Sequence, residues 1–352
     1  MNRATWRGRR VFLTGHTGFK GSWLALWLAD MGAEVHGYAL APPKDGFFCA
    51  VGVHSHLASS TLADLRDLPA LRHAMSAARP EVVFHLAAQA LVRQSYAEPV
   101  ETFAVNVLGT AHVLEAARAV EGVRAVVCVT TDKVYENREW PWAYRENDPL
   151  GGHDPYAASK ACAELVTASY RASFLAAAGV QVATVRAGNV IGGGDCSMDR
   201  LVPDILRAVD AGETLVIRAP NATRPWQHVL EPLSGYLLLA ERLLDGGPVF
   251  ADAWNFGPAD GDARPVQWIV EQLSARLGGA PWRLDAGPRP KEAHALRLDS
   301  SRAAALLGWR PAWDLAIALD HTVAWHRAWR AGDDLAALSL AQMRAREAAG
   351  VP

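Results

Sequence analysis

Glycines recur at every third position from Gly15 to Gly21, between an apolar segment and a helix-forming one, and this arrangement restricts the fold more than any other feature. Residues 10–14 before it have the composition of a buried strand, and residues 22–31 after it form a helical pattern with an apolar face. A second strand is predicted over 34–40. The chain therefore opens with a β-α-β unit, which favours a parallel sheet with right-handed crossovers.

The glycine turn is suited to a diphosphate group. Backbone N–H groups at the start of a helix, together with the positive end of the helix dipole, attract phosphate, and glycine allows a close approach. An ordinary strand–helix turn is the alternative. We predict that the turn binds a dinucleotide cofactor through Gly15, Thr17, Gly18, Phe19, Lys20 and Gly21.

The choice between NAD and NADP does not follow from the residues. A carboxylate at the end of the second strand usually holds the adenosine ribose, but residues 36–40 contain none. Asp64, followed by Leu65, could instead meet the adenine amino group. Alternatively, Asp64 could cap a helix that begins near Leu68.

Strand and helix patterns continue to alternate beyond the first unit. Further strands are predicted over 82–86, 125–129 and 180–185, and helices over 99–120 and 156–177. This alternation predicts an α/β fold with a doubly wound parallel sheet of the Rossmann type.

The pattern changes after Asn189, where glycine and proline become frequent and the elements shorter. We interpret residues 1–188 as the dinucleotide-binding domain and 189–332 as mainly a smaller C-terminal lobe that binds substrate. Segments near 228–258 are expected to return to the first domain, and 333–352 to form a helical tail.

Composition excludes several classes of partner. The net charge is −2, so nothing indicates nucleic-acid binding. The 4 cysteines are scattered, which favours neither a disulfide framework nor a metal site and suits a reducing, cytoplasmic location. No segment approaches the roughly 20 apolar residues that cross a bilayer. We expect no metal, no nucleic acid and no membrane partner.

Tyr156 and Lys160 are four positions apart in a predicted helix, so they share one face. A phenol has an ordinary pKa of about 10, and a neighbouring ammonium group favours the phenolate. With a cofactor turn upstream, the pair predicts hydride transfer. The alternative is an exposed tyrosine and lysine with no chemical role.

Several motifs in order along the chain resemble the extended short-chain dehydrogenase/reductase superfamily. They are the turn at 15–21, His85-Leu-Ala-Ala-Gln89, Asn106-Val-Leu-Gly109, Thr130-Thr-Asp-Lys133 and Tyr156-x-x-x-Lys160. Within it, residues from about 9 to about 330 are similar to the CDP-glucose 4,6-dehydratases, most specifically over 15–24, 131–133, 137–140, 186–195 and 224–232.

The resemblance implies that CDP-D-glucose loses water to give CDP-4-keto-6-deoxy-D-glucose, with a tightly bound NAD that takes a hydride from C4 and returns it at C6. Tyr156 is implied to take the proton of the 4-hydroxyl, and Lys160 to lower the tyrosine pKa and to reach the nicotinamide ribose. Thr131 is implied to bind the 4-hydroxyl or the phenol.

Asp132 and Lys133 are implied in the elimination. Asp132 would protonate the leaving 6-hydroxyl. Lys133 would either take the C5 proton or stay charged and stabilise the enolate, and a salt-bridged pair without a chemical role is the alternative.

Further contacts follow from the same resemblance. The cofactor would meet Ala87, Ala88, Gln89 and Asn106, although Asn106 could instead fix the backbone near Lys160. The substrate would meet Arg93, Ser95, Asn189, Arg200, Arg224, His228, Glu292 and His294. His85 is expected in the core.

Relatives pair subunits through the helices predicted at 99–120 and 156–177, which implies a homodimer or a homotetramer. Two other functions stay open. One is another nucleotide-sugar dehydratase or a 4-epimerase on the same scaffold. The other is a non-catalytic regulator that binds NAD.

Overall fold

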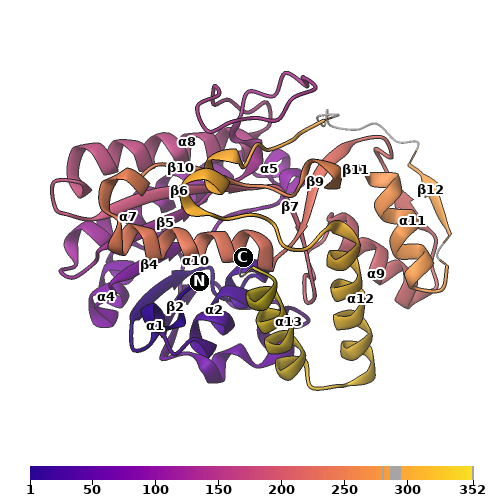
Figure 1. Cartoon of the computed structure of the whole chain (residues 1–352), viewed down its shortest axis with the longest axis horizontal. Coiled ribbons are helices and arrows are strands. Elements are labelled where there is room, and N and C mark those ends of the chain that lie inside the picture. The colour runs from indigo at the N-terminus through magenta and orange to yellow at the C-terminus, as the bar shows by residue number, and fades with distance from the viewer. Residues whose placement is uncertain (280, 286–294, 351–352) are drawn as a thin grey trace.

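The computed structural model describes residues 1–279, 281–285 and 295–350 (Figure 1). Its main sheet contains β1 (Arg10–Thr14), β2 (Glu34–Ala39), β3 (Ser59–Leu62), β4 (Val82–His85), β5 (Ala125–Val129), β6 (Gln181–Ala187) and β10 (Ala253–Phe256). Among the described residues this sheet has 7 strands in the order β10-β6-β5-β4-β1-β2-β3, and each neighbouring pair is parallel. The predicted Rossmann-type sheet is confirmed, with its switch point between β1 and β4.

Helices cover both faces of the sheet because successive strand residues point to opposite sides. Val11 and Leu13 belong to one apolar cluster, and Phe12 between them belongs to another. The first cluster packs beneath α2 (Phe19–Asp30), α10 (Leu230–Asp245) and α13 (Leu335–Ala349), and the second beneath α4 (Leu68–Ala78) and α7 (Gly109–Ala119), near α8 (Pro155–Tyr170).

The two long predicted helices each contain a π-helical turn. The first consists of α6 (Pro99–Phe103), η2 (Ala104–Leu108) and α7, and the second of α8 followed by η4 (Arg171–Leu175). The edge strand β3 was not predicted, because three of its four residues are serine or threonine and its pattern lacks an apolar run.

The second lobe lies to the right in Figure 1 and has its own small core. Its elements are β7 (Asn189–Ile191), β8 (Leu215–Ile217), β9 (Thr223–His228), β11 (Ala263–Pro265), β12 (Trp282–Leu284), α9 (Leu201–Ala211), α11 (Val266–Arg276) and α12 (Leu315–Ala331). Between these segments the chain returns to the main sheet as α10 and β10, and it ends in α13, which packs against α2.

Short elements occupy several connections. They are α1 (Arg3–Trp6), α3 (Phe47–Val51), η1 (Val53–His56), α5 (Val92–Ala97), η3 (Asp132–Val134), η5 (Gly247–Phe250), η6 (Asp260–Asp262) and η7 (Ala303–Leu307).

Glu164 ties α8 to the sheet through a buried polar network. Its carboxylate accepts hydrogen bonds from the hydroxyls of Thr130 and Thr184 at 2.5 and 2.6 Å, and from Arg186 Nε and Nη2 at 2.8 and 3.0 Å. Burial opposes the charged carboxylate, but Arg186 and the two hydroxyls outweigh it and hold the pKa of Glu164 below its ordinary value. The network therefore fixes the helix that carries Tyr156 and Lys160.

Replacing Glu164 by glutamine is expected to lower the free energy of unfolding by about 3–5 kcal/mol, because Arg186 is then buried without its counter-charge. The folded pKa lies below the unfolded value, so the carboxylate stabilises the fold above about pH 4.3 and this contribution is lost as the pH falls further. Urea unfolding followed by circular dichroism at pH 7 and pH 4 measures both effects. Glu121→Gln, at an exposed turn, is the matched control. A loss below about 1 kcal/mol at pH 7 would contradict the role given to this pair.

Candidate active site

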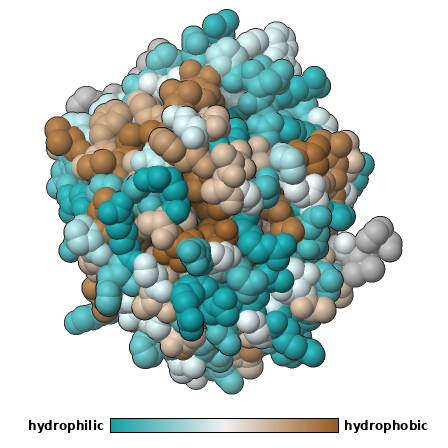
Figure 2. Space-filling view, turned by 90° about the vertical axis from the view of Figure 1, so that its left-hand side faces the viewer, coloured by the Kyte–Doolittle hydropathy of each residue, from teal (hydrophilic) through white to brown (hydrophobic). Residues whose placement is uncertain are grey.

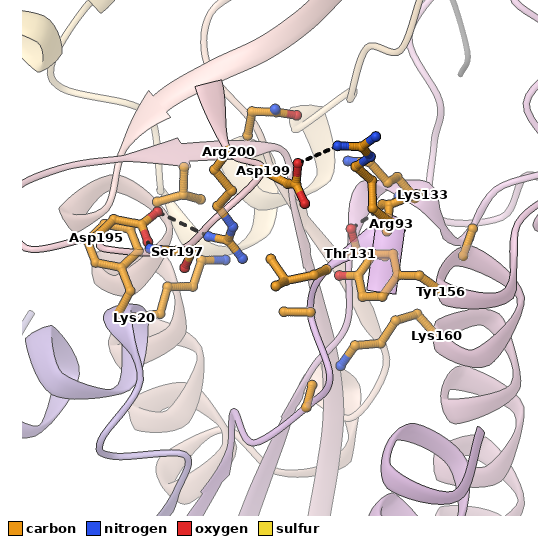
Figure 3. A pocket seen from close by; sticks show the side chains of 18 of the residues that line it. Lys20, Arg93, Thr131, Lys133, Tyr156, Lys160, Asp195, Ser197, Asp199 and Arg200 are labelled. Carbon is orange, nitrogen blue, oxygen red and sulfur yellow. Dashed lines mark hydrogen bonds and ion pairs between the residues drawn. The ribbon is translucent and has the colours of Figure 1, made fainter. Parts of the chain in front are cut away.

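A pocket of about 1000 Å³ lies where the carboxyl ends of the main-sheet strands face the second lobe. Segments that follow β1, β4, β5 and β6 contribute to its wall, as expected at the switch point of a doubly wound sheet. Figure 3 shows side chains from both lobes directed into this space.

The predicted cofactor turn forms a tight cradle at one end of the pocket. A Cβ atom at Gly21 would lie 2.0 Å from the Gly15 carbonyl oxygen, and one at Gly15, where φ is +77°, would lie 2.6 Å from the Ala87 nitrogen. Gly18 is the N-cap of α2 and adds no side-chain cap. The first N–H groups of α2 are therefore left for a ligand, and the cradle fits a diphosphate.

Two further residues of the expected cofactor site have contacts of their own. Thr17 donates its hydroxyl hydrogen to the Leu40 carbonyl at 2.9 Å, which fixes the turn to the end of β2. Asp64 lines the pocket and accepts hydrogen bonds from Arg66 Nε and Nη2 at 3.0 and 2.6 Å. The helix-cap alternative for Asp64 is wrong, since Asp67 caps α4 through the Ala70 N–H.

Tyr156 and Lys160 reach into the pocket from α8, which begins at Pro155 behind the capping residue Asp154 (Figure 3). Burial raises the pKa of Tyr156 to about 12, and the hydrogen bond with Thr131 opposes this rise. Burial lowers the pKa of Lys160 to about 8, and its Nζ donates to the Val129 carbonyl at 3.0 Å. Desolvation of the phenol therefore prevails in this structure, and the lowering of the tyrosine pKa by Lys160 stays a prediction.

Asp132 and Lys133 follow β5 in the short helix η3, where Thr131 is the N-cap. Asp132 Oδ1 accepts hydrogen bonds from Thr131 Oγ1 at 3.0 Å and from Lys133 Nζ at 3.2 Å. Asp132 Oδ2 is buried and has no hydrogen-bond partner in the described part of the chain. Thr131 and Lys133 line the pocket, so the ion pair lies at its edge with one carboxylate oxygen uncommitted.

Asn106 and Gln89 position other parts of the site. Asn106 exchanges two hydrogen bonds with the Gln89 backbone, at 2.9 and 3.0 Å, and its Nδ2 donates to Ser159 Oγ at 2.9 Å. The Gln89 amide donates to Leu91 O and Thr102 Oγ1. Both side chains form hydrogen bonds inside the protein, and neither lines the pocket. The cofactor contacts expected of them are therefore corrected to a role in positioning the site. Asn106 links the loop after β4 to the residue before Lys160.

The remaining expected cofactor residues line the pocket. Ala87 and Ala88 contribute to the wall after β4, and Leu65 to the wall after β3. His85 is buried, with Nδ1 and Nε2 2.8 and 3.0 Å from the hydroxyls of Thr14 and Thr110, as expected for a core residue.

The expected substrate residues divide into two groups. Four of them line the pocket: Arg93, Asn189, Arg200 and Arg224. Ser95 and His228 do not, and their assignment is corrected because both are fully buried. Ser95 donates to the Val92 carbonyl at 2.6 Å, and His228 packs among aromatic rings, including that of Trp313 with centroids 5.1 Å apart. Glu292 and His294 lie outside the described residues.

The sequence analysis missed several acidic and basic residues at the pocket, among them Asp195, Asp199 and Arg218. Asp195 accepts from Arg200 Nη1 at 3.3 Å, and Asp199 joins Arg93 and Arg218 through contacts of 2.6 and 2.9 Å. Asp195 closes the motif at 186–195 and could have been included on that signal. Asp199 and Arg218 carry no local pattern, since Asp199 meets Arg218 19 residues away in the same lobe and Arg93 in the other lobe.

Among the described residues, no helix is long and apolar enough to cross a membrane. Over the same residues, no group of three or more histidine, cysteine, aspartate or glutamate side chains could hold a metal ion.

A diphosphate cradle, a Tyr–Lys pair on the crossover helix and an Asp–Lys pair after β5 thus meet at one switch point. The chain belongs to the NAD dependent epimerase/dehydratase family, whose model matches residues 11–255.

Within that family, the chain is 52% identical to a CDP-glucose 4,6-dehydratase from Salmonella typhimurium strain LT2, over 95% of each chain. It is 30% identical to a dTDP-glucose 4,6-dehydratase from Streptomyces griseus, over 76% of this chain and 77% of that one. The fold is similar to the crystal structure of DesIV, a dTDP-glucose 4,6-dehydratase from Streptomyces venezuelae with NAD and TYD bound. That match has a TM-score of 0.79 and 26% identity, and covers 92% of this chain and 99% of the other.

Proposed function

We propose that this protein is an NAD-dependent CDP-glucose 4,6-dehydratase, a hydro-lyase that converts CDP-D-glucose to CDP-4-keto-6-deoxy-D-glucose and water. The observation that carries the reaction type is that Tyr156, Lys160 and Lys133 line one pocket, with Asp132 paired to Lys133 at its edge. The choice of CDP-glucose is supported by the 52% identity over 95% of both chains.

NAD would be held along the floor of the pocket. The cradle from Gly15 to Gly21 would bind its diphosphate, Asp64 and Leu65 would meet the adenosine end, and Lys160 the nicotinamide ribose. When bound, NAD accepts a hydride from C4 of the sugar and delivers it to C6.

Tyr156 takes the proton of the 4-hydroxyl as C4 is oxidised, with Thr131 holding the phenolic oxygen. Burial lowers the pKa of Lys160 to about 8, so its amine loses a proton before the phenol does as the pH rises. The ammonium form of Lys160, one helical turn from Tyr156, would favour the phenolate that acts as base.

The second pair carries out the elimination. Oxidation at C4 acidifies the C5 proton, and the 6-hydroxyl leaves as water once it has received a proton. Lys133 Nζ lies 3.2 Å from Asp132 Oδ1, so the proton of the ion pair can move from the ammonium to the carboxylate and leave a neutral amine beside a carboxylic acid. In that form Lys133 accepts the C5 proton while Asp132 gives its own to the 6-hydroxyl, and Lys133 returns a proton to C5 when C6 is reduced.

Incubation of the NAD-loaded enzyme with CDP-glucose in deuterium oxide tests the proposed function. We expect a 4-keto-6-deoxy product with deuterium at C5, identified by NMR. CDP-galactose without deuterium would identify a 4-epimerase, and no conversion of CDP-, dTDP-, UDP- or GDP-glucose would identify a binding protein. Faster turnover of another nucleotide sugar would overturn the choice of CDP-glucose alone.

We also propose a homodimer that pairs α6, η2 and α8 with their counterparts. Large apolar side chains stay exposed on these elements and on η4: Val100, Phe103, Leu108, Leu165 and Phe174. Figure 2, which views the left-hand side of Figure 1, shows hydrophobic side chains on the surface at that end of the molecule. Such patches usually mark interfaces. Light scattering that gives a monomer mass would exclude both the dimer and a tetramer built from it.

A cytoplasmic location is proposed because the 4 cysteines are free.

A further inference from the structure

Lys20, in the first turn of α2, directs its ammonium group into the pocket (Figure 3). In the described part of the chain, its Nζ forms no ion pair with a carboxylate, and its polar contact is Tyr236 Oη on α10 at 3.5 Å. Lys20 is half-buried, and an ammonium group partly withdrawn from water without a counter-charge is unfavourable. Its position indicates a partner that arrives with a ligand.

Arg200 approaches the same place from the second lobe, at the N-cap of α9. Figure 3 shows the nitrogen of Lys20 and the guanidinium of Arg200 on the same side of the pocket, across from Tyr156 and Lys160. Asp195 pairs with Arg200 at 3.3 Å, so this carboxylate is engaged by one of the two cations. Asp195 therefore balances the charge of Arg200 but not that of Lys20, and an anionic ligand would balance the ammonium charge of Lys20.

We propose that Lys20 is a substrate-binding residue whose ammonium group, together with Arg200, binds the diphosphate of the nucleotide sugar. This inference rests on the proposed function, because it places a nucleoside diphosphate in the second lobe. It goes beyond the cofactor role predicted for Lys20, which needs only the backbone N–H at the start of α2. The side chain extends away from that N–H toward a residue of the other lobe, so it serves the anion that the second lobe binds.

Charge and burial at Lys20 add a measurable consequence. Burial, and after it the charge of Arg200, lower the pKa of Lys20 to about 7. A bound anion favours the ammonium form, so above pH 7 binding should take up a proton and affinity should fall as the pH rises. The other charged or titratable groups that face this position are Asp132, Lys133, Tyr156, Lys160, Asp195 and Tyr236.

Isothermal titration calorimetry on the full-length protein tests the inference, with CDP and NAD as separate probes. Lys20→Met should weaken CDP binding by about tenfold to a hundredfold, the loss of one charge-assisted contact, and leave NAD binding within about threefold. Lys20→Arg keeps the charge and should recover most of the CDP affinity. Lys44→Met, an exposed lysine outside the pocket, is the matched control and should change neither. Titrations at pH 8 in two buffers of different ionisation enthalpy should show proton uptake with CDP that Lys20→Met abolishes.

Each other outcome overturns the inference. Unchanged CDP affinity in Lys20→Met removes the contact, and a loss confined to NAD assigns the side chain to the cofactor diphosphate. An equal loss for both ligands that Lys20→Arg does not recover indicates a disturbed α2.

Repeating the titration with dTDP, UDP and GDP separates this inference from the proposed function. If the protein prefers another base, the ratio of wild-type to Lys20→Met affinity should still hold, because all these ligands carry the same diphosphate.

Discussion

Replacing Tyr156 by phenylalanine is expected to lower kcat for CDP-glucose by about a thousandfold or more while NAD still binds. The change removes one oxygen atom, the atom that accepts the 4-hydroxyl proton, and keeps the ring that packs at the start of α8. In this structure the hydroxyl lies within hydrogen-bonding reach of Thr131. Single-turnover formation of reduced nicotinamide measures the first step directly.

Tyr170→Phe, at the far end of the same helix, is the matched control and should keep near wild-type turnover. Calorimetric titration with NAD shows whether the cofactor site survives in Tyr156→Phe. If this variant retains more than about a tenth of the wild-type kcat, the phenol is not the base and the first step must be reassigned.

Replacing Asp132 by asparagine is expected to separate the two halves of the reaction. Asparagine keeps the shape of the side chain and can still contact Thr131, but it has no carboxyl proton to give to the leaving hydroxyl. Oxidation at C4 should therefore persist, whereas water loss should slow by about a hundredfold to ten-thousandfold. Rapid-quench sampling with mass spectrometry should detect a 4-keto sugar that retains its 6-hydroxyl, and absorbance should reveal accumulated reduced nicotinamide.

Lys133→Met is the companion variant, since it removes the other member of the ion pair and should slow water loss as well. Asp333→Asn, on the exposed surface after α12, is the control for the substitution itself. Equal slowing of oxidation and water loss in Asp132→Asn would mean that this buried carboxylate supports the whole site rather than the elimination.

The fold could be predicted because its signals are local. The buried strands β1, β4 and β5 read as uninterrupted apolar segments, and the switch to helix is marked by glycine and proline. The edge strand β3 has no such apolar segment. Its side chains are only partly covered, so serine and threonine can occupy three of its four positions. The π-helical turns were also missed, because one extra residue in a turn leaves the apolar pattern of a helix nearly intact.

The site could be predicted as a set of chain positions rather than as a set of side-chain directions. Tyr156, Lys160 and Lys133 line the pocket, but Ser95 and His228, which were also expected to meet a ligand, turn into the interior. A motif fixes the place of a residue along the chain. Whether its side chain meets a ligand depends on the packing of elements far away in the sequence.

The sequence by itself determined the parallel sheet and the diphosphate cradle, because strand alternation and the absence of a Cβ in glycine act within a few residues. Only the tertiary structure decided the protonation of Tyr156 and Lys160 and the meeting of Lys20 with Arg200 from the other lobe. The physical reason is that charge–charge energies depend on distance through space, and desolvation depends on the water excluded when the chain folds. Neither quantity can be obtained from the residues adjacent in the sequence.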